Sequence, residues 1–205
     1  MDERASSRSP VRSPAKGASV EDGDWAEELD RIDSAVYSAI AQTPTPTLDQ
    51  AFRRLSAAAD HSKLWFASAA ALTILGGPGG RRAAANGVAS IALTSAVVNA
   101  VLKPLARRRR PDRREYGVPV GRHVRMPLTR SWPSGHAASA FAFASGVAMA
   151  APGAGIGLMA LAATVAYSRV HTGVHYPGDV VAGSVMGAAF APVAVAVLER
   201  RRRAR

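Results

Sequence analysis

A short polar stretch, Ser168-Arg169-Val170-His171-Thr172-Gly173-Val174-His175-Tyr176-Pro177-Gly178-Asp179, joins two strongly apolar runs near the end of the sequence. Ionisable groups beside membrane-length apolar segments are costly to hold, so such a cluster indicates a functional site. Pro177 suits the first turn of a helix, where its missing N–H costs nothing. Asp179 would then lie in that first turn, one helical turn after His175. A carboxylate there can bind one imidazole nitrogen and leave the other free to attack.

Two further clusters supply chemistry that this stretch lacks. Pro133-Ser134-Gly135-His136 precedes an apolar run, with Ser134 as a natural N-cap and Gly135 allowing close approach of the backbone. A helix that begins there binds anions through its free N–H groups and its dipole. Lys103-Pro104-Leu105-Ala106-Arg107-Arg108-Arg109-Arg110-Pro111 ends another apolar run and adds fixed cations. Together the three clusters contain the groups needed for phosphoryl transfer without a metal ion.

In chain order, the patterns Lys103-x6-Arg110-Pro111, Pro133-Ser134-Gly135-His136 and Ser168-Arg169-x5-His175-x3-Asp179 resemble the three-part signature of type 2 phosphatidic acid phosphatases (PAP2). This superfamily also contains bacterial undecaprenyl-pyrophosphate phosphatases, glucose-6-phosphatase and the vanadium haloperoxidases. The resemblance covers roughly residues 48–198. It implies that His175 is the nucleophile, Asp179 its orienting partner and His136 the general acid. It also implies a phosphate-binding set made of Lys103, Arg110, Ser134, Gly135 and Arg169, and no cofactor.

The net charge of +11 is unevenly distributed along the chain. Residues 1–63 carry eleven acidic and eight basic residues, whereas the rest carries eighteen basic and four acidic residues. Most of these basic residues fall in 103–130 and 200–205, next to apolar segments, which favours a membrane protein over a nucleic-acid-binding one. The chain contains no Cys, which excludes disulfides and thiol chemistry.

The chain divides into four regions by composition. Residues 1–23 are rich in Ser, Pro, Arg and Gly and are expected to form a disordered tail. Residues 24–62 are expected to form amphipathic helices at the membrane interface, because the periodic segments Trp25–Ala41 and Leu48–Ala59 are too short and polar to span. Residues 63–199 form the expected membrane phosphatase domain, followed by a basic tail at 200–205.

The expected fold is an all-α integral membrane bundle with about five transmembrane helices, or six. The candidate spans are Leu64–Leu75, Ala83–Leu102, Ser134–Ala151, Ile156–Val170 and Val180–Leu198. Their many Ala, Gly and Ser residues fit close packing of helices within a bilayer. A soluble helical bundle is the alternative that the modest overall hydropathy leaves open.

The orientation follows from two basic clusters. Arg81-Arg82 and Arg200–Arg203 should be cytoplasmic by the positive-inside rule. With five spans, loops 106–132 and 171–178 then lie on the outer face of the plasma membrane, so the active site faces away from the cytoplasm. The same rule would pull the Arg-rich loop inside, and we expect several of its arginines to bind phosphate instead.

Three groups of residues have simpler possible roles. His171, His175 and Asp179 have the i, i+4, i+8 spacing of a metal-binding face, but Gly173 and Pro177 interrupt any continuous helix, so no metal site is expected. Arg107, Arg108 and Arg109 are a charge run, which is usually solvated or attracts anionic headgroups. Trp65, Trp132 and Tyr176 are expected to form an aromatic belt at the membrane interface.

The predicted function is metal-independent hydrolysis of a lipid phosphate or pyrophosphate monoester through a phosphohistidine. The membrane and its lipid phosphate are the expected partners, and nucleic acid is not. Three alternatives stay open: an acid phosphatase or phosphotransferase acting on a soluble ester, a vanadate-dependent peroxidase, and a basic adaptor without enzymatic activity. Polyprenyl pyrophosphate, phosphatidic acid, phosphatidylglycerol phosphate and polyprenyl-phosphoryl sugar phosphates all present the same group, and no motif distinguishes them.

Overall fold

The computed structural model describes residues 24–204, and every regular element in that range is a helix. The predicted disordered tail, 1–23, lies outside the described residues. The long helices are α1 (Asp24–Gln42), α2 (Pro46–Ala58), α3 (Lys63–Leu75), α4 (Gly77–Val97), α6 (Gly135–Ala148), α7 (Pro152–His171) and α8 (Pro177–Arg203). The short ones are η1 (Asp60–Ser62), the π-helical turn η2 (Val98–Leu102), α5 (Lys103–Leu105) and η3 (Val120–Arg122). The all-α prediction is confirmed.

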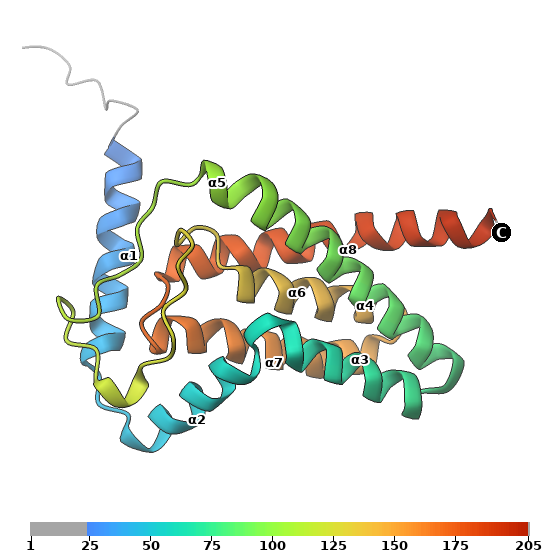
Figure 1. Ribbon diagram of the computed structural model, residues 1–205, viewed down its shortest axis with the longest axis horizontal. Coiled ribbons are helices and arrows are strands. Elements are labelled where there is room, and N and C mark those ends of the chain that lie inside the picture. The colour runs from blue at the N-terminus through green and yellow to red at the C-terminus, as the bar shows by residue number, and fades with distance from the viewer. Residues whose placement is uncertain (1–23, 205) are drawn as a thin grey trace, which may run out of the picture.

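Helix α6 is the centre of the bundle and packs against α4, α7 and α8 (Figure 1). Glycines of α8 allow its backbone to approach that of α6. A Cβ atom added to Gly187 would lie 2.2 Å from the carbonyl oxygen of Ala138, and one added to Gly183 would lie 2.4 Å from that of Ser134. Such contacts between small residues are typical of helices packed within a bilayer. They hold the first turn of α6 directly against α8.

Three helical segments are long and apolar enough to cross a membrane: Gly77–Leu105, Pro152–His171 and Pro177–Arg203. Helices α3 and α6 have 13 and 14 residues, or about 20 Å at 1.5 Å per residue, and the hydrocarbon core is about 30 Å thick. The expected spans at Leu64–Leu75 and Ser134–Ala151 are therefore shorter in the structure than a full crossing. The total of five spans stays a prediction.

Two boundaries differ from those expected. The Gly-rich segment predicted to separate two spans belongs mostly to α4, which begins at Gly77, because Pro78 occupies the first turn and needs no hydrogen bond there. At the other end of the chain, α8 continues through Arg203, so most of the predicted basic tail is helical.

The aromatic-belt prediction is wrong for Trp65. Its side chain is 1% exposed and packs against Phe143 of α6, with the two ring centroids 5.7 Å apart. Tyr176 lies under the guanidinium of Arg108, 4.4 Å from the ring centroid. Trp65 therefore packs inside the protein, whereas Tyr176 is partly buried beside Arg108.

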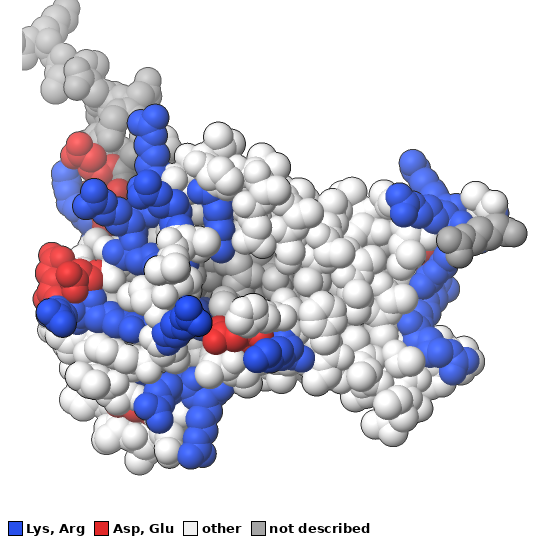
Figure 2. Space-filling view, viewed as in Figure 1, with Lys and Arg blue, Asp and Glu red and all other residues white. Residues whose placement is uncertain are grey.

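Charged side chains gather at the two ends of the bundle, with a band of uncharged surface between them (Figure 2). Helix α1 runs crosswise to the bundle at one end, where it contacts α7 and α8 (Figure 1). One face of α1 carries the exposed apolar side chains Trp25, Leu29, Ile32 and Val36, which line a pocket shared with Trp132 and the start of α8. This amphipathic character agrees with the helix predicted for Trp25–Ala41, and its place at the membrane interface stays a prediction.

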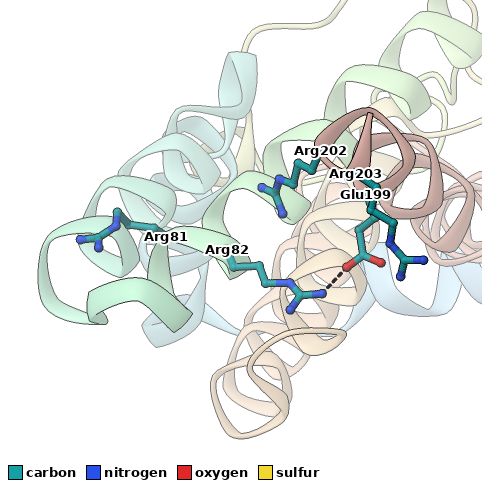
Figure 3. Close-up of a pocket in the computed structure, with 5 residues that line it drawn as sticks. All are labelled: Arg81, Arg82, Glu199, Arg202 and Arg203. Carbon is teal, nitrogen blue, oxygen red and sulfur yellow. Dashed lines mark hydrogen bonds and ion pairs between the residues drawn. The ribbon is translucent and has the colours of Figure 1, made fainter. Parts of the chain in front are cut away.

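The opposite end of the bundle is basic. An ion pair between Arg82 and Glu199 joins α4 to α8 beside a cavity of about 420 Å³, which is also lined by Arg81, Arg202 and Arg203 (Figure 3). The two basic clusters that define the predicted cytoplasmic side therefore meet at one end of the molecule.

Candidate active site

The start of α8 brings His175 and Asp179 together as the spacing predicts. The Asp179 carboxylate is fully buried, and its Oδ2 atom lies 3.3 Å from Nδ1 of His175. The same oxygen accepts a hydrogen bond of 3.0 Å from the backbone N–H of Tyr176 and another from the hydroxyl of Ser131. A carboxylate held in this way keeps the His175 proton on Nδ1 and leaves the lone pair on Nε2.

Arg110 lies on the other side of the imidazole. Its Nη1 atom is 3.0 Å from Nε2 of His175 and donates to the carbonyl oxygen of Val174 at 2.7 Å, while Nε donates to that of Thr129 at 2.9 Å. Burial lowers the pKa of Arg110 to about 10, which leaves it protonated at neutral pH. Since this cation can only donate, Nε2 must be the acceptor, in agreement with the tautomer that Asp179 selects.

Burial lowers the pKa of the His175 imidazole to about 3. The side chain is 1% exposed, and its desolvation disfavours the imidazolium form. His175 is therefore neutral across the physiological pH range, which is the protonation state required of a nitrogen nucleophile.

The first turn of α6 and the short helix α5 form the second part of the site. A Cβ atom on Gly135 would lie 3.2 Å from Nζ of Lys103, so glycine leaves room for the ammonium group at the helix start. Lys103 follows the π-helical turn η2, a feature that often occurs at functional sites. Thr129 connects this part to the first, because its hydroxyl lies 3.5 Å from Nζ of Lys103 and 3.3 Å from Nη2 of Arg110.

Two buried polar atoms at the site have no hydrogen-bond partner within the described part of the chain: Ser134 Oγ and Arg169 Nε. Arg169 extends from α7, is 1% exposed, and binds the hydroxyl and the carbonyl oxygen of Ser56 through Nη1. Buried polar groups without partners are rare in proteins. A phosphate oxygen is the kind of acceptor that both groups could bind.

His136 points toward the N-terminal half of the chain. Its Nε2 atom lies 2.8 Å from Oδ1 of Asp60, which belongs to the short η1 helix. A cavity of about 450 Å³ opens beside His136, lined by Lys103 and Gly135 and also by Phe66 and Ile91. The polar groups of the site thus meet apolar side chains of α3 and α4.

Arg108 contradicts the prediction of a solvated charge run. Its Nη1 atom lies 3.2 Å from Oδ1 of Asp179 and 2.6 Å from Asp33, and its Nη2 lies 2.9 Å from Asp30. The carboxylate that orients His175 is therefore held in turn by a cation anchored to α1. The sequence offered no signal for this contact, because Arg108 lies in a run of four arginines.

His171 points away from the catalytic pair. Its Nε2 atom binds Asp49 of α2 at 3.0 Å, and Asp49 also binds Arg122 at 2.8 Å. Among the described residues, no group of three or more His, Cys, Asp or Glu side chains is arranged to hold a metal ion.

Comparison with known proteins identifies the family. The chain matches the PAP2 superfamily model over residues 83–203. It is 40% identical over 157 residues to the decaprenylphosphoryl-5-phosphoribose phosphatase of Mycolicibacterium smegmatis, a match that covers 75% of this chain and 80% of that one. The Mycobacterium tuberculosis protein of the same name is 36% identical over 115 residues, and the match spans 56% of this chain but 61% of that relative. The chain belongs to the PAP2 superfamily.

Two solved structures share the fold. Aquifex aeolicus LpxE has a TM-score of 0.63 and 24% identity, over 80% of this chain and 94% of that one. A transmembrane PAP2-type phosphatidylglycerolphosphate phosphatase from Bacillus subtilis has a TM-score of 0.60 and 21% identity, over 84% and 87%. At these identities the likeness concerns the fold alone, and it confirms the predicted helical membrane bundle.

Proposed function

We propose that this protein hydrolyses the phosphate monoester or pyrophosphate of a membrane lipid through a phosphohistidine at His175. The observation that carries the proposal is the position of His175 Nε2, a neutral nitrogen backed by Asp179 on Nδ1 and adjacent to the Arg110 guanidinium. The name and 40% identity of the Mycolicibacterium smegmatis relative support a phosphorylated polyprenyl-phosphoryl sugar as the first substrate to test.

The proposed reaction has two steps, after which both histidines have returned to their starting state. Nε2 of His175 attacks phosphorus, the bond from phosphorus to the leaving oxygen breaks, and His136 gives that oxygen its proton. Water then attacks the phosphohistidine and loses a proton to His136, which releases phosphate and regenerates both histidines. Asp179 stabilises the positive charge that the imidazole acquires while it carries the phosphoryl group.

The remaining site residues stabilise the negative charge of the phosphoryl oxygens. Lys103, Arg110 and Arg169 supply cations for the phosphoryl oxygens, and the Ser134 hydroxyl and the backbone N–H at Gly135 supply donors at the start of α6. In a site shielded from water, such preorganised groups stabilise the charge that develops in the transition state.

The lipid enters from the bilayer in this proposal. The cavity beside His136 is lined by Phe66, Ile91 and Ala92 of α3 and α4, which suits a lipid chain, and by Lys103, which suits its phosphate. We place the enzyme in the plasma membrane with this end facing away from the cytoplasm, because Arg81-Arg82 and Arg200–Arg203 cluster at the other end.

The test is phosphate release by the purified protein in lipid nanodiscs. The substrates are decaprenylphosphoryl-5-phosphoribose, phosphatidylglycerol phosphate, phosphatidic acid and the soluble ester p-nitrophenyl phosphate. His175→Ala should abolish turnover of every substrate, because no phosphoenzyme can form, whereas His123→Gln, outside the site, should retain activity. Turnover by His175→Ala at the wild-type rate would refute the mechanism, and preference for the soluble ester would refute the lipid substrate.

A further inference from the structure

Asp60 is a charged residue inside the site that belongs to none of the three signature clusters. It lies between α2 and α3, outside residues 83–203 that match the superfamily. Its Oδ1 atom is 2.8 Å from Nε2 of His136 and 3.9 Å from Nη1 of Arg169. Nε2 of His136, the residue proposed above as the general acid, is therefore already bound to a carboxylate of the protein.

The backbone that presents Asp60 is sterically disfavoured. The two residues that follow it, His61 and Ser62, have φ angles of 56° and 59°, in the left-handed region that non-glycine residues rarely adopt. Such conformations persist only where the surroundings hold them, and they concentrate at functional sites. Ala59, just before the turn, and Trp65, just after it, are both buried.

Charge explains why a carboxylate is useful at this position. In the described part of the chain, the charged groups that face His136 are Asp60, Arg169 and Lys103. Burial of the imidazole and the two cations favour its neutral form, and together they lower the pKa of His136 below its usual value in spite of Asp60. Only Asp60 acts in the opposite direction, and the hydrogen bond from His136 holds the pKa of the Asp60 carboxyl below its usual range.

We propose that Asp60 is a positioning residue for the general acid: it favours the protonated form of His136 and holds its Nε2–H in place until the leaving oxygen takes over that hydrogen bond. The inference rests on the proposed function. Asp60 itself neither gains nor loses a proton, since the proton passes from His136 to the leaving oxygen and returns from water. The Asp60 side chain is 38% exposed, which leaves it free to rotate aside.

The test compares Asp60→Asn and Asp60→Glu with Asp112→Asn. Asp112 is an exposed loop residue whose carboxylate accepts a hydrogen bond from the backbone N–H of Arg114. For each variant, kcat/KM is measured against pH on a lipid phosphate and on p-nitrophenyl phosphate. Loss of the carboxylate lowers the pKa of His136, so the basic limb of the Asp60→Asn profile should move to lower pH. Above that limb, activity on the lipid should fall about tenfold for each unit of displacement.

The two substrates separate proton donation from structural damage. A lipid alkoxide leaves poorly without a proton, whereas p-nitrophenolate leaves well without one, so Asp60→Asn should lose much less activity on the nitrophenyl ester. Asp60→Glu should restore part of the lipid activity, and Asp112→Asn should behave as wild type. The burst of p-nitrophenolate from phosphoenzyme formation confirms that each variant is folded.

Two outcomes would overturn the inference. An unmoved basic limb with equal losses on both substrates would make Asp60 a structural residue. Higher activity of Asp60→Asn on both substrates would make Asp60 a competitor of the substrate anion. Either result leaves the proposed function intact, whereas failure of that function appears separately, as turnover by His175→Ala.

Discussion

His175 is buried as a neutral imidazole, and this has a consequence for stability as well as for catalysis. Its pKa is lowered by burial to about 3 in the folded protein, against about 6.5 in an unfolded chain. Between these values the unfolded state binds a proton that the folded state does not. The free energy of unfolding is therefore unaffected by protonation of His175 above pH 6.5. As pH falls from 6.5 toward 3 it decreases, by up to about 1.4 kcal/mol per pH unit.

We expect His175→Asn to reduce this acid sensitivity. The melting temperature in detergent should fall less between pH 7 and pH 4.5 for this variant than for wild type, because the group that titrates is gone. His123→Gln serves as the control and should keep the wild-type slope. An equal slope in His175→Asn and wild type would show that His175 is protonated in the folded protein.

Single residues also show where sequence reasoning stops. His175 and Asp179 could be paired from the sequence, because Pro177 predicts a helix start that places Asp179 in the first turn, close to the residues just before the helix. The contact between Asp60 and His136 joins residues 76 positions apart, and it depends on the irregular turn at His61. No sequence periodicity predicts such a turn, so the contact between Asp60 and His136 could not be predicted from the sequence.

Among the helices, α6 shows how a short element positions the site. The backbone N–H of Ser134 donates to the carbonyl oxygen of Asp179 at 2.9 Å, and Gly183 of α8 faces the carbonyl oxygen of Ser134. A side chain at Gly183 would push the start of α6 away from the catalytic pair.

We therefore expect Gly183→Ala to lower both the melting temperature and kcat, since its Cβ atom would lie 2.4 Å from a backbone oxygen that cannot move freely. Overpacking of this kind typically costs about 1–3 kcal/mol. The matched control is Gly157→Ala on α7, where a Cβ atom would meet nothing within 4 Å. Equal stability of the two variants would mean that α6 and α8 can separate without cost.

The positions of helices were easier to predict than their ends. The periodic segment Trp25–Ala41 corresponds closely to α1, because amphipathic spacing extends over the whole element. The run Ser134–Ala151 was expected to be a span, yet α6 ends at Ala148 and α7 begins at Pro152. A short helix surrounded by other helices is as apolar as a membrane span. Its apolar composition therefore does not reveal its length.

At the scale of the whole molecule, α8 is long enough to separate the active site from the basic end of the bundle by the thickness of a membrane. From Asp179 to Arg202, α8 rises about 35 Å, comparable with a hydrocarbon core of about 30 Å. The active site and the arginine cluster shown in Figure 3 would then lie at opposite membrane surfaces.

The proposed orientation is testable by cysteine labelling, since the chain has no cysteine of its own. A cysteine introduced by Leu128→Cys, at a fully exposed position of the active-site loop, should react with a membrane-impermeant thiol reagent in intact cells. One introduced by Arg202→Cys should react only after the cells are permeabilised, and the unsubstituted chain should not react. The reverse pattern would place the active site in the cytoplasm.

The cavity that opens between α3, α4 and α6 would admit a substrate that diffuses within the plane of the membrane. A substrate that enters from the bilayer is never dissolved in water, so its effective concentration is its mole fraction among the surrounding lipids. Diluting the membrane with an inert phospholipid then slows turnover at constant total substrate, whereas diluting the buffer does not. The two products also separate by phase, because phosphate escapes into water while the dephosphorylated lipid remains in the same leaflet as the substrate.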